Sequence, residues 1–84
     1  MTTETMLLKM AKSADYEVRC AAMRDAAATE AVLLMGVCDK NRTVRCNAVA
    51  HPNATEAVLR RGIADRSMIV RTVAAGHTNY KAQF

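Results

Sequence analysis

Two histidines, His51 and His77, are candidates for acid–base catalysis or metal binding in this 84-residue sequence. Imidazole can transfer protons near neutral pH and is a common ligand of zinc. The histidines occupy matching places in two similar segments of the chain. Adjacent helical layers would hold them about 10 Å from each other, which is too far to share one zinc ion. We therefore interpret both histidines as turn residues and predict no metal site.

Three cysteines, Cys20, Cys38 and Cys46, do not add a metal or redox site. Their number is odd and no two are spaced as CxxC, so the sequence predicts neither a disulfide framework nor a zinc knuckle. We expect all three to be small core residues. The sequence also contains no recognisable nucleophile with its base, phosphate-binding glycine loop or carboxylate pair. We therefore predict no catalytic residue, no cofactor and no enzymatic activity.

The charge distribution offers a second kind of chemistry, which is phosphate binding. The net charge is +4, and the residues from Asp39 onward hold eight of the twelve lysines and arginines but only three of the eight acids. Five of these cations could contact a nucleic-acid backbone with salt-dependent affinity: Lys40, Arg42, Arg60, Arg61 and Arg66. Aromatic residues, which stack on single-stranded bases, make up only 4% of the chain. The alternative interpretation of the cations is a solvated outer face.

A sequence repeat must position these side chains. The segment TEAVL at 29–33 recurs at 55–59, which sets the period at 26, and 11 of the 23 positions from Thr29 to His51 are identical to those one period further on. A fixed period of this kind is typical of stacked structural repeats, whose units share one core. We expect one domain over residues 1–84, made of a half-unit 1–12, units at about 13–38 and 39–64, and a partial unit 65–84.

Each unit contains two segments with helical periodicity. Apolar residues in the first segment fall at Val32, Leu33 and Val37, and Thr29 is expected to cap the helix by accepting from free amides, as is Thr55. Gly36 and Gly62 lie inside these segments, where glycine costs about 1 kcal/mol relative to alanine, so a close approach by a neighbour is expected. The predicted helical segments are 3–12, 16–24, 29–38, 42–50, 55–64 and 68–77.

One pattern in the chain resembles a known repeat family. The residues from Asp39 to Leu59 read D-x4-V-R-x2-A-x2-H-P-N-x-T-E-x2-L, which resembles the leucine-rich repeat variant family and, more distantly, HEAT-like repeats. The first unit departs from the pattern, with Ser13 in the place of the Asp. The resemblance implies an all-α, right-handed α-solenoid of about three two-helix repeats, with some segments short enough to be 3₁₀ turns. It also implies an interaction role rather than catalysis.

Arginines recur at one position of the repeat, at Arg19, Arg45 and Arg71. In a stack they would line up along its length, and partly buried arginines need acceptors such as Asp39 and Asp65. We interpret these five residues as a structural ladder. A row of arginines that faces a ligand is the alternative.

The last unit replaces polar residues with apolar ones. Ile69 stands where earlier units have Glu17 and Thr43, and Val73 stands where they have Ala21 and Asn47. We expect another segment or molecule to shield these apolar residues from water, because the ends of stacked repeats require polar caps and the sequence shows no such cap. Either the tail from Tyr80 to Phe84 or another molecule could do so.

These observations favour a small adaptor or inhibitor that binds another protein. We predict its interface at Met68, Ile69, Val73 and Phe84, with self-association through uncapped ends as a further option. Nucleic-acid backbone binding is the alternative function. No apolar run approaches the roughly 20 residues of a membrane span, and the N-terminus lacks the pattern of a signal peptide, so we expect a soluble, cytoplasmic protein.

Overall fold

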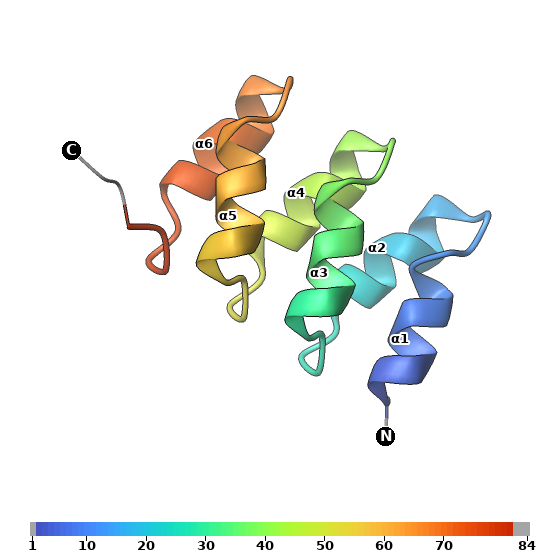
Figure 1. Cartoon of the computed structure of the whole chain (residues 1–84). Coiled ribbons are helices and arrows are strands. Elements are labelled where there is room, and N and C mark those ends of the chain that lie inside the picture. The colour runs from blue at the N-terminus through green and yellow to red at the C-terminus, as the bar shows by residue number, and fades with distance from the viewer. Residues whose placement is uncertain (1, 82–84) are drawn as a thin grey trace.

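Six α-helices occupy most of residues 2–81, the part of the chain that the computed structural model describes (Figure 1). No strand occurs within this range, so the predicted all-α class is confirmed. Each helix lies inside its predicted segment and is at most three residues shorter. The helices are α1 (Glu4–Met10), α2 (Tyr16–Arg24), α3 (Glu30–Val37), α4 (Arg42–Ala50), α5 (Glu56–Ile63) and α6 (Met68–Ala75).

The helices form two rows, α1–α3–α5 and α2–α4–α6. Each helix packs against its neighbours in the chain and against the next helix of its own row, and within residues 2–81 no helices further apart than that make contact. The turns after α1, α3 and α5 follow one edge of the molecule, and the turns after α2, α4 and α6 follow the opposite edge (Figure 1). The molecule is consequently elongated, with extents of 39 × 22 × 13 Å.

The core lies between the two rows and is built from residues that recur once per repeat. Leu7, Leu33 and Leu59 are all fully buried, and so are Val44 and Val70. The helical spacing of these residues places them on the inner side of each helix. Val18, the counterpart of Val44 one repeat earlier, is only half-buried, because α2 is the first helix of its row and has no neighbour on that side.

The two helical glycines lie where neighbouring helices come closest, as the sequence predicts. A Cβ atom on Gly62 would come within 2.7 Å of Val49 Cγ1 and 2.8 Å of Ala74 Cβ. At Gly36 the corresponding neighbours are Met23 Sδ and Ala48 Cβ, the latter 2.9 Å away. Real Cβ atoms do not approach other atoms this closely, so both positions require glycine.

Two expectations from the sequence are wrong, namely the hydrogen bonds of the N-cap threonines and the burial of all three cysteines. Thr29 and Thr55 do stand at the N-caps of α3 and α5, but their hydroxyls accept no amide hydrogen bond. They donate instead to the carboxylates of Glu4 and Glu30, one helix earlier in the row. The charge of the carboxylate acceptor strengthens each of these hydrogen bonds.

The cysteines are not all core residues. Cys20 is buried, but Cys46 is half-buried and Cys38 is exposed at the end of α3. On α6, Val70 and Ala74 are buried whereas Ala75 is exposed. The exposed residues Cys38 and Ala75 lie at or next to the last residue of a helix, where the inner face no longer has a partner.

Candidate protein-binding face

Two of the three arginines at the repeated position, Arg19 and Arg45, are held in buried ion pairs on the edge formed by the turns after α1, α3 and α5. Arg19 Nε lies 2.8 Å from Asp39 Oδ2, and Arg45 Nε lies 2.8 Å from Asp65 Oδ2, with side chains no more than 10% exposed. Arg45 Nη1 also donates to the carbonyl of Asp39 at 3.0 Å. Each pair therefore joins the turn of one unit to the turn of the next. Arg71 donates to the Asp65 carbonyl at 2.7 Å.

The environment of Asp65 favours its charged form. Burial raises the pKa of this carboxyl, but the hydrogen bond from the Ser67 amide, the hydrogen bond and charge of Arg45, and the charge of Arg66 together outweigh burial. The pKa of Asp65 consequently lies below its ordinary value of 3.8. The carboxylate is thus ionised at neutral pH, as an ion pair with Arg45 requires.

A second ladder, which the sequence did not predict, follows the opposite edge. His51 Nδ1 accepts from the Asn53 amide at 2.9 Å, so its Nε2 carries the proton and donates to the Asp25 carbonyl at 2.7 Å. His77 repeats this arrangement, with Nε2 2.8 Å from the carbonyl of His51. The recurrence of the histidines at one address of the repeat was the available signal. Their role is to connect neighbouring turns, since both ring nitrogens are occupied.

Asparagines strengthen this second ladder. Asn53 Nδ2 donates to the carbonyls of Ala26 and Ala28 at 3.2 and 3.3 Å, and Asn79 Nδ2 donates to those of Pro52 and Ala54 at 3.1 and 3.0 Å. Turn carbonyls that would otherwise face only water thus gain partners one unit later in the chain.

The predicted apolar interface lies on the outer face of α2, α4 and α6, which we call the even-helix face. Met68 is 70% exposed and Ile69 is 50% exposed, while Val73 is half-buried against the core. Their counterparts on α4, Arg42 and Thr43, are exposed although α4 has neighbours on both sides. The apolar residues therefore lie on the side of the row rather than on its end. Phe84, also predicted in this interface, lies outside the described residues.

The end of the other row is polar, contrary to the expectation that no cap exists. Leu8 and Leu34 are half-buried against the core on α1 and α3, and Arg60 takes the same place on α5. Arg60 is exposed and forms an ion pair with Glu56 at 2.8 Å. Arg60 thus stands where the earlier units have leucine, and its ion pair with Glu56 makes this surface of α5 polar, as the capping units of stacked repeats are.

The five candidate phosphate-binding residues are all exposed but belong to different elements. Lys40 and Arg66 lie in the turns after α3 and α5, on one edge of the molecule, and Arg42 begins α4 (Figure 1). Arg60 is paired with Glu56, and Arg61 Nη1 lies 3.6 Å from Cys38 Sγ on the neighbouring helix of its row. Two of the five cations therefore already have partners.

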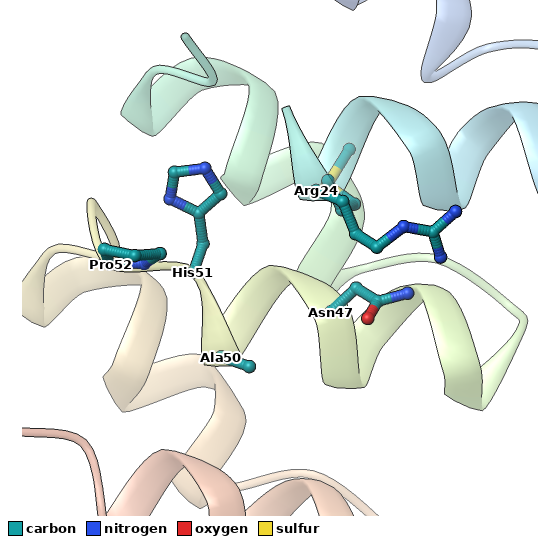
Figure 2. Close-up of a pocket in the computed structure, with 6 residues that line it drawn as sticks. Arg24, Asn47, Ala50, His51 and Pro52 are labelled. Atoms are coloured by element: carbon teal, nitrogen blue, oxygen red, sulfur yellow. The ribbon is translucent and has the colours of Figure 1, made fainter. Parts of the chain in front are cut away.

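An open pocket of about 290 Å³ lies between the end of α2 and α4, and the sequence did not predict it (Figure 2). Its lining contains two hydrogen-bond donors, Arg24 and Asn47. The amide nitrogen of Asn47 is buried and has no hydrogen-bond partner, which costs about 1–3 kcal/mol. Arg24 is exposed and makes no ion pair within residues 2–81. In the sequence, Asn47 is distinguished only by its replacement with Val73 one unit later.

Neither a metal centre nor a membrane span is found in the described part of the chain. Histidine, cysteine and acidic side chains do not gather there in groups of three that could hold a metal ion. None of the helices between residues 2 and 81 has the length and apolar character that crossing a bilayer requires.

Comparison with known proteins does not add a family. No family model matches the chain, and no curated protein or solved structure shows significant similarity to it. The resemblance to leucine-rich repeat variant and HEAT-like repeats therefore stays a prediction from the residues.

Proposed function

We propose that this protein is a non-catalytic adaptor or inhibitor module that binds another protein through its even-helix face. The observation that carries the proposal is the exposure of Met68 and Ile69 on a face where α4 has Arg42 and Thr43. Exposed apolar side chains that adjoin one another on one face are typical of protein interfaces. Val73 extends this patch into the core, so the anchors are held by a packed helix.

We further propose that the chain is a short α-solenoid of two-helix units that repeat with the period of the sequence. Three observations support this architecture: contacts are confined to neighbouring helices, buried residues recur at the period, and both polar ladders repeat with it. The resemblance to leucine-rich repeat variant and HEAT-like repeats implies the same architecture. Solenoids present an extended surface, and protein binding is a frequent use of that surface.

Phosphate-backbone binding has less support from the geometry. Arg60 and Arg61 already contact Glu56 and Cys38, and the other cations lie on separate elements. Self-association also has less support, because the exposed Glu56–Arg60 pair covers one end of the stack with charge.

Partner capture with matched variants tests the protein-binding proposal. We expect Ile69→Asp to abolish capture of the partner, because a carboxylate would have to be desolvated in an apolar contact. Ala57→Asp is the control, since it places the same charge at an exposed position of α5, outside the even-helix face. Both variants should unfold at the temperature of the wild type. An identical set of captured proteins for Ile69→Asp and the wild type would refute the proposed interface.

A further inference from the structure

We propose that the pocket between α2 and α4 binds the carboxylate of a glutamate side chain on the partner protein. This inference rests on the proposed function, because it names the chemistry of a second contact on the same even-helix face. Asn47 occupies on α4 the place that Val73 occupies on α6, so the pocket and the apolar patch share that face.

Two residues of the pocket lining carry donors that have no partner in the described chain. The Asn47 amide nitrogen is buried without a partner, and the Arg24 guanidinium makes no hydrogen bond or ion pair within residues 2–81. Figure 2 shows both side chains projecting from their helices toward the same side of the pocket. Both groups are donors only, so the ligand that satisfies them is an acceptor. A carboxylate offers two acceptor oxygens and complements the charge of arginine.

The other pocket residues do not compete for this role. His51 has both ring nitrogens engaged, one with the Asp25 carbonyl and one with the Asn53 amide. The carboxylate of Asp25, next to Arg24 in the chain, accepts from the Ala27 amide at 2.8 Å instead of pairing with Arg24. Within residues 2–81 neither Arg24 nor the Asn47 amide nitrogen has an acceptor, which leaves both open to water or to an acceptor on another molecule.

The apolar part of the lining points to a carboxylate on a stem. Met23, Ala50 and Pro52 complete the pocket between the two helices. Methylene groups entering beside these residues would lose contact with water, which favours a glutamate side chain over a bare anion.

The next pair of helices lacks this chemistry. One unit further on, Ala50 replaces Arg24 and Val73 replaces Asn47, so the corresponding place between α4 and α6 lacks both of these donors. A partner segment that crosses the even-helix face would thus place an acidic residue at α2 and α4 and an apolar residue at α6. Neighbouring helix axes lie about 8–10 Å apart, which sets the spacing of these two anchors.

Two substitutions taken from the chain itself test the pocket. Arg24→Ala and Asn47→Val introduce the residues found one unit later, so both variants should keep the fold. Arg42→Ala removes an exposed arginine from the same face but outside the pocket, and is the control for net charge. The probe is N-acetylglutamate amide, with N-acetylglutamine amide as its neutral isostere. The backbone amide resonances of Met23 and Ala50 report binding in an NMR titration.

We expect a saturable shift with the glutamate probe, with a dissociation constant on the order of 1–10 mM. The affinity should fall about tenfold or more in Arg24→Ala and Asn47→Val, because each removes a hydrogen bond to a charged group, and should be unchanged in Arg42→Ala. No shift with the glutamate probe, equal shifts with the glutamine probe, or equal affinity in the pocket variants would overturn the inference. Acetate that binds as tightly as the glutamate probe would also overturn it, because the stem would then contribute nothing.

The two proposals can fail separately. A partner that is captured by the wild type, lost by Ile69→Asp and retained at full affinity by Arg24→Ala would leave the protein-binding proposal intact and remove the pocket from it. Failure to find any partner that depends on Ile69 would remove the protein-binding proposal, while the titration with the glutamate probe still decides whether the pocket binds a carboxylate.

Discussion

Asp39 connects two units through two different groups. Its carboxylate accepts from Arg19, and its carbonyl accepts from Arg45. The same carboxylate accepts from the Asn41 amide at 2.8 Å, which holds the turn before α4. Three donor residues, Arg19, Arg45 and Asn41, therefore converge on Asp39, and Asp65 repeats this arrangement with Arg45, Arg71 and the Ser67 amide as donors. Ser13, at the same position in the first turn, has a hydroxyl in place of the carboxylate, and its carbonyl accepts from Arg19 Nη1 at 2.8 Å.

We predict that Arg45→Ala lowers the free energy of unfolding by about 3–5 kcal/mol, since it leaves the buried carboxylate of Asp65 without its counterion. Urea denaturation measures the effect. Arg60→Ala is the matched control, because its ion pair with Glu56 is exposed and should contribute less than about 1 kcal/mol. Equal losses for the two variants would show that burial of the Arg45 pair contributes nothing.

The Arg–Asp pairs could be predicted from the sequence, because an arginine that recurs at a packed address needs an acid nearby. That Arg24 and Asn47 line one pocket as donors without a partner in the described chain could not be predicted from the sequence. An unpartnered donor is visible only when the burial of the group and the position of every neighbour are known, and neither Arg24 nor Asn47 recurs with the repeat. The hydrogen bonds of His51 depend likewise on turn geometry, which residue types alone do not specify.

At the scale of the helices, the two interior glycines show how tightly the rows pack. In isolation, alanine would stabilise α5 at position 62 by about 1 kcal/mol relative to glycine. In the folded chain the added methyl would meet Ala74 Cβ, which cannot move without its backbone, at 2.8 Å. Packing therefore outweighs helix propensity at this position.

We predict that Gly62→Ala destabilises the protein by about 1–3 kcal/mol, the usual cost of overpacking a core. Thermal unfolding followed by circular dichroism measures the loss. Gly76→Ala, at the end of α6, is the control, because its Cβ would come no closer than 3.5 Å to another atom, the Thr72 carbonyl oxygen. A melting temperature for Gly62→Ala at or above that of Gly76→Ala would contradict the close approach.

The positions of the helices were predictable, because apolar spacing and the turn residues between units agree with each other. The bonding of Thr29 was not. Sequence rules for N-caps consider only the helix that follows, whereas here the Thr29 hydroxyl donates to an acid on the previous helix of the row, Glu4. Local rules fail at this position because the partner is 25 residues away.

At the scale of the whole molecule, an apolar core lies between two polar ladders. One ladder pairs arginines with aspartates along the edge of the turns after α1, α3 and α5, and the other links histidines and asparagines to carbonyls along the opposite edge. Each contact joins a unit only to its neighbours. Stability should accordingly accumulate unit by unit, as in quasi-one-dimensional proteins.

The change to apolar residues in the last unit was visible in the sequence, but its location was not. A repeat period shows that Ile69 and Thr43 are equivalent, and does not show whether their common address faces the side of a row or its end. The exposure of Thr43, on a helix covered from both directions, resolves the question. The side of the row is the surface that the proposed partner contacts.

Insertion of a second copy of residues 39–64 directly after Ala64 tests the stacking of the repeated units most directly. The inserted copy repeats its own ladders and core, and both of its junctions preserve the order of turns in the chain. Urea unfolding of the longer chain should remain a single transition, with a higher midpoint and a larger m-value, because one more interface is buried. A midpoint at or below that of the original chain, or a separate transition for the insert, would contradict a stack of equivalent units.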